Sequence, residues 1–578
     1  MKITKKIFAT LLLLIVFTFS CKDDFLEVAP TGSLTTSLLT SLNGLEGTLI
    51  GSYSMLSGRG GFYAGTTNWL WGSVLGAEAN KGTNSGDQAQ VNEIQAYSPQ
   101  TTNESVLSKY QTTYEGIARA NALLRLLPNA DAVVPAASKT RMEAEGRFLR
   151  GFYYFELKKI YDNTPYIDET VDYKAGIEQV ANDVDLWPMI EADLLFAYTN
   201  LPETQSAVGR ANKWSAGAFY AKALLFQGKY AAAKVVFDLV KTGKTPNNLT
   251  YGLVTNYGEL WRIATDQSKE VVFAIQSSAA TGTINNANPD FVLNFPYNGG
   301  PAGCCGFNQP SFELANSFRT VAGLPILTST ANLGDYNLPA NDLDTDQGVA
   351  AGGTSYVPDA GTLDPRLDHS VGRRGIPYLD HGKHPGIAWI RDQNYGGPYA
   401  PKKFIWSKAE EATGVDKSSW TPGYSALNVP LMRFADVLLM LAECEVELGN
   451  LETARGLVND VRLRAKTGAY VMDGASPAAN YSINTYTTPW TVPADARTAV
   501  RMERKLELSG EGHRFFDLVR WGVADAVLSA YLMYEKGKVS ASPFTGDTFT
   551  AGKSEHMPIP QREIDIIGSS ILTQNSGY

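Results

Sequence analysis

Apolar positions recur every three or four residues in two segments of the chain, and the two patterns share one register. Residues 211–241 read as two helices that meet at Gly228, and the same arrangement returns around Gly449. The matched positions of the first helix are Trp214, Ala218, Ala221 and Leu225 in one segment, and Ala435, Leu439, Ala442 and Val446 in the other. Any helical hairpin carries such stripes, but the common register and the small residues favour a tetratricopeptide-type helix pair that is used at least twice.

Further stripes predict helices on either side of these hairpins. These helices cover residues 38–56, 107–124, 141–161, 183–200 and 497–510. A β-branched run at residues 271–276 predicts a strand. Residues 58–95 and 556–578 are expected to be irregular. Residues 281–420 are rich in glycine, proline, asparagine and aromatic residues, and they show few stripes. A structureless loop of that length is improbable inside a compact domain. The patterns therefore predict a mainly α fold, in which helical hairpins support an irregular, loop-rich lobe with short strands.

The first residues predict export. Three lysines precede an apolar run at residues 7–19, which is shorter than the about 20 residues that span a bilayer. A small residue then precedes Cys21, as at a lipoprotein cleavage site. We therefore expect a signal peptide at residues 1–20, a lipid on Cys21 and a tether at residues 21–36. The alternative is a secreted protein with an unmodified cysteine.

Charge and cysteine content narrow the function classes. The 578 residues carry a net charge of −9, and loss of the three lysines of the signal peptide takes it to −12. This balance argues against nucleic acid and against an anionic membrane surface as partners. Four cysteines are too few for a disulfide scaffold. Cys304 and Cys305 are adjacent, so they form either a vicinal disulfide or two thiols packed beneath a loop.

Two spacings resemble metal sites, and neither is complete. His381 and His384 have the spacing of a zinc pair, but they lie in a segment rich in proline and glycine with no cysteine nearby. Asp342, Asp344 and Asp346 alternate as in a calcium loop, but the following glycine comes one place late. A solvated acidic turn is the better interpretation. We expect no metal and no cofactor.

The sequence also lacks the features of an enzyme. It contains neither a Gly-x-Ser-x-Gly nucleophile motif nor a Gly-x-x-x-x-Gly-Lys phosphate-binding motif. Glycoside hydrolysis needs two carboxylates that face one cleft. Glu443, Glu445 and Glu447 fall on a predicted repeat helix, where a solvated face is the simpler interpretation. We expect a protein without catalytic activity.

Two regions outside the helical stripes have the composition of a sugar-binding site. Such a site uses flat aromatic faces for the apolar side of the sugar ring, together with polar side chains for its hydroxyl groups. One region contains Trp69, Trp71, Asn80, Lys81 and Asp87. The other contains Tyr297, Asn298, Trp389, Arg391, Asp392, Asn394, Tyr395 and Tyr399. Each aromatic residue could instead pack in the core. Trp389, Tyr395 and Trp71 are the strongest candidates for ligand contact.

Several dispersed motifs, in the same order along the chain, resemble those of the SusD/RagB family of Bacteroidetes. They are CKDDFLEVAPTGSL, AEGRFLRGFYYFELKKIYDNTPYI, LMRFADVLLMLAECEVELG, ERKLELSGEGHRFFDLVRWG and HMPIPQREIDI. The resemblance implies about four tetratricopeptide-like pairs that cradle a variable lobe. Residues 37–245 would contain the first three pairs, residues 246–425 the ligand-binding lobe, and residues 426–578 the fourth pair. The first pair would join the helices near Leu38 and Leu107, and the second those at 141–161 and 183–200.

The same resemblance implies a function. Members of the family are lipid-anchored proteins of the cell surface that bind glycan and deliver it to a SusC-like TonB-dependent transporter in the outer membrane. The residues after Cys21, Lys22-Asp23-Asp24, resemble the acidic tag that sends such lipoproteins to the surface. Peptide capture, as in RagB-like members, is the alternative, and glycoside hydrolysis is a weaker one. The resemblance also implies that the aromatic regions on either side of the scaffold converge on one site.

Overall fold

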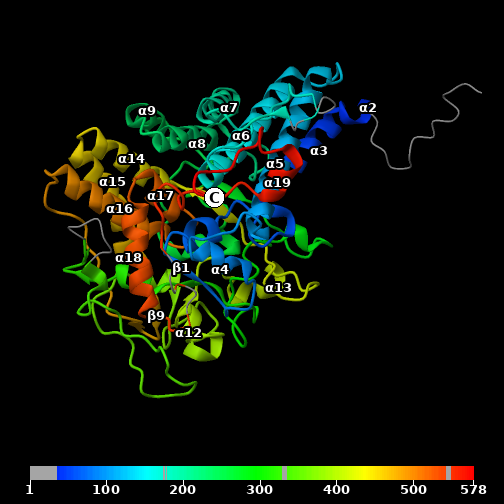
Figure 1. Ribbon diagram of the computed structural model, residues 1–578. Coiled ribbons are helices and arrows are strands. Elements are labelled where there is room, and N and C mark those ends of the chain that lie inside the picture. Colours follow the sequence, from blue (N-terminus) through cyan, green and yellow to red (C-terminus); the bar gives the residue numbers. More distant parts are fainter. Residues whose placement is uncertain (1–35, 173–175, 177–178, 328–334, 542–543, 545–547) are drawn as a thin grey trace, which may run out of the picture.

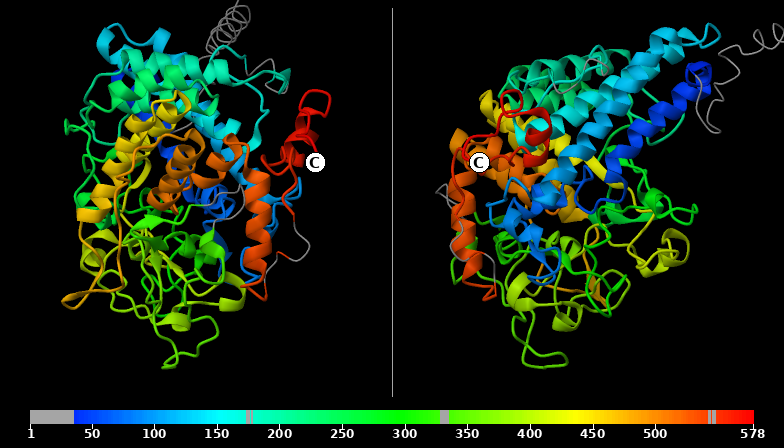
Figure 2. Two further views of the ribbon diagram at one scale, coloured as in Figure 1. Left: turned by 90° about the vertical axis from the view of Figure 1, so that its left-hand side faces the viewer. Right: turned by 45° about the vertical axis from the view of Figure 1, so that its right-hand side comes forward.

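The computed structural model describes residues 36–172, 176, 179–327, 335–541, 544 and 548–578. Its larger helices gather in one part of the molecule, and loops of the middle of the chain fill the other part (Figure 1). Figure 2 shows the same division from two other sides. The predictions for Cys21, the signal peptide and most of the tether lie outside the described residues. No helix within the described ranges is long and apolar enough to cross a membrane.

Four helix pairs form the scaffold. They are α3 (Leu42–Tyr53) with α5 (Glu104–Leu126), α6 (Ala136–Tyr161) with α7 (Trp187–Asn200), α8 (Lys213–Phe226) with α9 (Tyr230–Val240), and α14 (Phe434–Glu447) with α15 (Leu451–Thr467). The two helices of each pair pack against each other. The predicted mainly α fold with helical hairpins is confirmed.

The turn glycines of the two aligned hairpins have the same backbone conformation. Gly228 has a φ of 70° and Gly449 a φ of 81°, in the left-handed region that only glycine enters at little steric cost. Ala218, Ala221 and Ala233 of the first hairpin are fully buried. Helix α9 also packs against α14, so the two copies are neighbours in space although the whole lobe separates them in sequence.

The last part of the chain adds four helices to the scaffold: α16 (Pro493–Leu508), α17 (Arg514–Arg520), α18 (Ala524–Lys536) and α19 (Gln561–Ile567). Helix α16 begins earlier than predicted, at a proline, which is favourable in a first helical turn. The prediction of an irregular end was wrong at α19. This helix is short and buries only Ile564, so the sequence shows no apolar stripe there.

Short elements make up the lobe and its borders. The antiparallel strand pairs are β1 (Ala79–Gly82) with β3 (Phe307–Pro310), β2 (Val271–Ile275) with β8 (Val429–Arg433), β4 (Thr320–Val321) with β5 (Leu324–Pro325), β6 (Val371–Gly372) with β7 (Ala400–Pro401), and β9 (Met472–Asp473) with β10 (Ser476–Pro477). The short helices are α2 (Thr36–Leu39), α4 (Gln90–Gln95), α10 (Phe312–Ser317), α11 (Leu367–Ser370), α12 (Gln393–Gly396) and α13 (Glu411–Gly414). The β2–β8 pair closes the lobe, because β2 leads into it and β8 leads back to α14.

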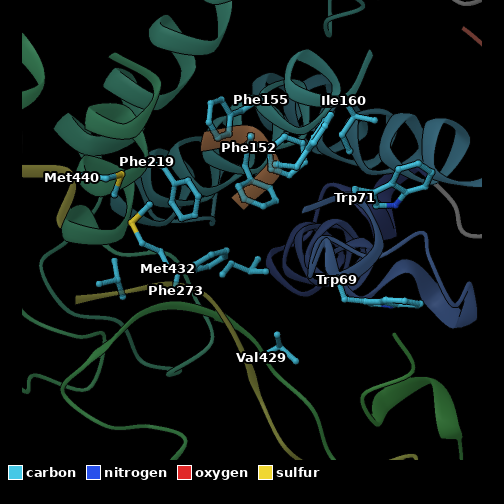
Figure 3. Close-up of a cluster of buried hydrophobic side chains, with 14 of the residues drawn as sticks. Trp69, Trp71, Phe152, Phe155, Ile160, Phe219, Phe273, Val429, Met432 and Met440 are labelled. Atoms are coloured by element: carbon cyan, nitrogen blue, oxygen red, sulfur yellow. The ribbon is translucent and has the colours of Figure 1, made fainter. Parts of the chain in front are cut away.

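An aromatic cluster joins the scaffold to the entrance of the lobe (Figure 3). Phe148 and Phe152 on α6 surround Phe219 on α8 and Phe273 on β2. The ring centroids of Phe148 and Phe273 lie 5.0 Å apart, and those of Phe152 and Phe219 lie 5.2 Å apart, both edge to face. Such pairs contribute about 0.5–1.5 kcal/mol each beyond the area that they bury.

Buried ion pairs tie the C-terminal helices to the lobe. Arg433 at the end of β8 donates to Glu507 and Glu511 at 3.0 and 2.7 Å, and Arg366 of the lobe donates to Glu503 on α16 at 2.6 Å. All of these side chains are excluded from solvent. Each arginine therefore needs its carboxylates, because an uncompensated buried charge is strongly destabilising.

The prediction that Glu443 and Glu445 form a solvated face was wrong. Both are buried, and Glu443 accepts hydrogen bonds from Arg520 at 2.8 Å and from the indole of Trp521 at 2.9 Å. Helix α17 covers this side of α14, which a stripe analysis of α14 alone does not reveal.

Candidate functional site

Trp69 and Trp71 are core residues, so the prediction that they contact ligand was wrong. Each is only 1% exposed, and both lie within the cluster of buried side chains (Figure 3). Their indole N–H groups donate to the carbonyls of Phe62 and Tyr63, at 3.1 and 2.7 Å. The backbone just after Trp71 packs so closely that a Cβ on Gly72 would lie 1.9 Å from the carbonyl oxygen of Gly512. Neither indole offers a face to a ligand.

Asn80 and Lys81 are also buried, on strand β1. The amide of Asn80 donates to Glu535 at 2.7 Å and accepts from Tyr531 at 2.8 Å. The ammonium of Lys81 donates to the carbonyl of Asp87 at 2.8 Å, and burial lowers the pKa of Lys81 to about 8. Both predictions of ligand contact were wrong, because the side chains of Asn80 and Lys81 are buried and hydrogen-bonded to other groups of the protein.

Tyr395 and Tyr399 are the last two buried residues among those predicted to contact ligand, and for them too this prediction was wrong. Both are 2% exposed. The hydroxyl of Tyr395 donates to Asn92 at 2.6 Å and accepts from Gln95 at 3.0 Å, and its ring lies 5.0 Å below the ammonium of Lys81. The ring of Tyr399 packs on Phe312. Tyr395 thus joins the lobe to β1 and α4, whereas Tyr399 packs within the lobe.

The remaining predicted residues reach the surface and come together there. Tyr297 and Trp389 are partly exposed, and the backbone N–H of Tyr297 donates to the carbonyl of Trp389 at 2.8 Å. The guanidinium of Arg391 lies 5.1 Å from the centre of the Tyr297 ring, and it donates to Asp87 at 2.6 Å. Asn298, which is exposed, follows Tyr297. The two sequence regions therefore meet, but through Asp87 rather than through the tryptophans of the first region.

Asp392 and Asn394 lie beside this group on α12. The carboxylate of Asp392 accepts the backbone N–H of Asn394 at 3.0 Å, as the N-cap of that helix. Asn394 is exposed, and its carbonyl accepts the N–H of Ala541. Asp392 thus has a structural role that accounts for its position.

Trp389 is held from several sides. Its ring packs edge to face on Tyr378 and His384, with centroids 5.5 and 5.2 Å apart. Gly300 approaches it so closely that a Cβ there would lie 3.3 Å from the indole Cδ2 atom. Burial lowers the pKa of His384 to about 3, so this imidazole is neutral. The histidine that sequence spacing linked to a zinc pair serves as packing for Trp389.

Cys304 and Cys305 are joined by a disulfide at the centre of the group. We refer to residues 296–306 as the disulfide turn. The N–H of Cys305 donates to the carbonyl of Leu293 at 3.0 Å, and the N–H of Gly306 donates to that of Phe295 at 2.8 Å. The turn thus rests on the preceding segment and carries Tyr297 and Asn298 on its outer side.

Trp420 belongs to the same neighbourhood, and the sequence reasoning missed it. Its side chain is 59% exposed, and its ring stands perpendicular to that of Tyr424. The hydroxyl of the next residue, Thr421, donates to the carbonyl of Ala302 in the disulfide turn at 3.2 Å. A lone tryptophan in the polar run KSSWTPGY, outside any stripe, was the available signal. We define the aromatic surface as Tyr297, Asn298, Trp389, Arg391, Asp87 and Trp420.

The acidic residues of the calcium-like spacing do not converge. Asp342 accepts from Asn316 at 2.8 Å and also pairs with Lys538, whereas Asp346 lies 3.7 Å from Arg374. Within the described ranges, no group of three or more histidine, cysteine or acidic side chains is arranged to hold a metal ion.

A separate groove of about 950 Å³ lies between the scaffold and the lobe. It is lined by Ile50 and Gly51 on α3, by Val208, and by the end of β2 with the loop around Asn285. Among the described residues that line it, Tyr53 is the one aromatic residue, and its hydroxyl donates to Glu145 at 2.7 Å. The part of the groove that the structure describes therefore offers polar and aliphatic groups rather than an aromatic platform.

Comparisons with known proteins match both halves of the chain. Residues 269–578 match the family model described as the SusD family, and residues 24–225 match a model described as starch-binding associating with outer membrane. SusD-like protein P25 of Formosa agariphila is 24% identical over 489 residues, which cover 82% of this chain and 80% of the relative. Starch-binding protein SusD of Bacteroides thetaiotaomicron is 24% identical over 463 residues, which cover 76% of this chain and 74% of SusD.

Solved structures show the same fold. A laminarin-binding SusD-like protein aligns with a TM-score of 0.65 and 24% identity, over 93% of this chain and 100% of that protein. A SusD superfamily protein from Bacteroides vulgatus aligns with a TM-score of 0.67 and 20% identity, over 93% of this chain and 99% of that protein.

Proposed function

This chain belongs to the SusD family, and from that premise we propose that it binds glycan at the aromatic surface without hydrolysing it. The observation that carries the proposal is the meeting of Tyr297, Trp389 and Arg391 at the surface of the lobe, beside the exposed ring of Trp420. Aromatic rings bury the apolar face of a sugar at low entropic cost, and the Arg391–Asp87 pair offers donors and acceptors for hydroxyl groups. The names of two relatives, which bind laminarin and starch, support this class of ligand.

The charge of the aromatic surface favours a neutral glycan. Arg391 donates to Asp87 at 2.6 Å and to the hydroxyl of Thr83 at 2.9 Å, so its charge is already balanced. Lys81 lies beneath the surface and is buried. An anionic sugar would have to compete with Asp87 for the guanidinium.

Binding without hydrolysis follows from the state of the carboxylates. A glycosidase needs one free acid and one free base or nucleophile on either side of the scissile bond. Both carboxylates of the predicted set have partners instead, since Asp87 pairs with Arg391 and Asp392 caps α12. Incubation with oligosaccharide should therefore release no reducing sugar.

We place the protein at the outer membrane, anchored through a lipid on Cys21 and working with a SusC-like TonB-dependent transporter. The match of residues 24–225 to a model described as associating with outer membrane supports the location. The position of Cys21 after a short apolar run supports the anchor. Replacing Cys21 by alanine should release the protein from the membrane fraction, and co-purification with a SusC-like transporter from the native membrane would test the partnership.

Peptide capture is the second candidate, and the groove between α3 and the lobe favours it. An extended peptide suits a groove with aliphatic walls and many hydrogen-bonding groups better than a flat aromatic patch does. Under this alternative, changes at Ile50 and Val208 would alter binding and changes at Trp389 would not.

Calorimetric titration separates the two candidates. We expect wild-type protein to bind laminarihexaose or maltohexaose, and the variant with Trp389→Ala and Trp420→Ala to bind at least about tenfold more weakly, which corresponds to about 1.4 kcal/mol. Trp490→Ala is the matched control. Trp490 is also partly buried, but it lies outside the aromatic surface, and its backbone N–H donates to Glu452 on α15. Binding of a peptide mixture but of neither sugar would favour the groove instead.

A further inference from the structure

The disulfide turn contacts every other segment of the aromatic surface. Its residue Tyr297 donates to the carbonyl of Trp389 at 2.8 Å. Its residue Ala302 accepts the hydroxyl of Thr421, next to Trp420, at 3.2 Å. Its residue Gly306 accepts the backbone N–H of Thr83 at 2.6 Å. The turn is therefore the common support of side chains that come from three distant parts of the sequence.

The link through Thr83 extends to the charged pair of the surface. The hydroxyl of Thr83 donates to Asp87 at 3.2 Å and accepts from Arg391 at 2.9 Å. Arg391 in turn lies over the ring of Tyr297, which belongs to the disulfide turn. A shift of the turn would therefore move Thr83, which is bonded to Gly306, and Arg391, which lies over Tyr297, at the same time.

We propose that the Cys304–Cys305 disulfide is the positioning element of the aromatic surface, which it keeps in the arrangement that binds glycan. The turn contains Gly299, Gly300, Gly303 and Gly306, and the last two have φ values of 66° and 78°. Glycine has the greatest backbone freedom of all residues, so such a turn on its own would sample many conformations. The disulfide closes a small ring between neighbouring residues and restricts their torsional freedom between Gly303 and Gly306.

The turn lies between the aromatic surface and the core, where Cys305 is buried and Ala302 packs against the lobe. It packs beside a small cluster of the lobe, formed by Phe295, Tyr378, Ile390 and Trp406, against which Trp389 lies. The carbonyl of Phe295 accepts the N–H of Gly306, and Cys305 belongs to the large core that also holds the helix pairs. Opening the disulfide should loosen the turn and leave the helices in place. This inference rests on the proposed function, because the quantity that it governs is affinity for glycan.

The test compares oxidised and reduced protein, using the mature lipidated chain in detergent. A water-soluble phosphine reduces the bond: one disulfide, one phosphine and one water give two thiols and one phosphine oxide. We expect reduction to weaken binding of laminarihexaose or maltohexaose about three- to tenfold, because the ligand must then order the turn. Reoxidation should restore the affinity. The variant with Cys304→Ser and Cys305→Ser should bind as weakly as the reduced protein, and it should not respond to the phosphine.

Hydrogen exchange gives a readout that needs no ligand. On reduction, amides of residues 297–306, 389–391 and 420–425 should exchange faster, while those of α8 and α14 stay unchanged. Equal exchange and equal affinity before and after reduction would overturn the inference. Alkylation of Cys304 and Cys305 in untreated protein would also overturn it, since the bond would then be absent. If oxidised wild-type protein binds neither sugar yet shows the expected exchange, the proposed function fails while the structural role of the disulfide stands.

Discussion

The segment around Trp71 and the segments around Trp389 and Trp420 have similar compositions and opposite surroundings. All are rich in glycine and aromatic residues and lie outside the helical stripes. Trp71 is buried next to Gly72, against which the backbone of Gly512 packs, and its indole N–H donates to the carbonyl of Tyr63. Trp389 lies at the edge of the lobe, and Trp420 projects from it. We infer from the difference that an irregular aromatic segment can bind ligand only where the scaffold leaves one of its faces open.

The largest effect should be a loss of stability when the buried Trp71 is replaced. Trp71→Ala removes a fully enclosed indole, so it should lower the free energy of unfolding by about 3–5 kcal/mol. Trp420→Ala, at an exposed position, should change it by at most about 0.5 kcal/mol. Chemical denaturation of both variants measures the contrast. Equal losses of stability would show that the two environments are not as different as the structure indicates.

The second effect concerns affinity for glycan, to which the exposed Trp420 should contribute although it contributes little to stability. Trp420→Ala should weaken glycan binding about three- to tenfold, since an aromatic contact contributes roughly 1 kcal/mol beyond general burial. Arg391→Ala should weaken it to a similar extent by leaving Asp87 without its partner. Titration of each variant with the oligosaccharide that wild-type protein binds gives the result. An unchanged affinity in both variants would move the binding site away from the aromatic surface.

On the balance of four buried carboxyls, stability should pass through a maximum near pH 4. Burial raises the pKa values of Glu78, Asp290 and Glu535 to about 7, so their contribution to stability is complete below about pH 4 and is lost as the pH rises through 7. Burial opposes ionisation of Glu507 as well, but Arg464 and Arg433 outweigh it and lower its pKa to about 2. That contribution is present above about pH 4 and is lost as the pH falls through 2.

Thermal unfolding between pH 3 and pH 8 measures this balance. The replacement Glu535→Gln should flatten the decline in stability between pH 5 and pH 8, because the amide does not ionise. A melting temperature that rises steadily from pH 5 to pH 8 in wild-type protein would contradict the assignment of these buried carboxyls.

The smallest effect should come from Tyr395. Replacing it by phenylalanine removes the hydroxyl that bonds to Asn92 and Gln95, so unfolding should become easier by about 1 kcal/mol. Glycan affinity should stay within twofold of the wild-type value, since the ring remains in place beneath the surface. A clear loss of affinity without a loss of stability would return Tyr395 to the binding site.

The helical hairpins could be predicted because their information is local. The stripe from Trp214 to Leu225 and the turn at Gly228 fix two helices without reference to distant residues. The site could be predicted only in part, because burial of an aromatic residue depends on what packs over it. Trp71 looks like a binding residue until Gly512, far along the chain, closes against its segment. Ligand contact by Trp389 stays a prediction, which its partial exposure permits. The lone Trp420 was missed because it lies in no pattern.

Hydroxyl-radical footprinting of the tryptophans tests the central claim most directly, with wild-type protein and saturating laminarihexaose or maltohexaose, whichever it binds. Oxidation of Trp420 and Trp389 should fall severalfold on binding. Trp71 should remain unreactive with and without sugar, because it is enclosed. Protection confined to Ile50, Val208 and Tyr53, with Trp420 oxidised equally in both states, would place the ligand in the groove and contradict the account.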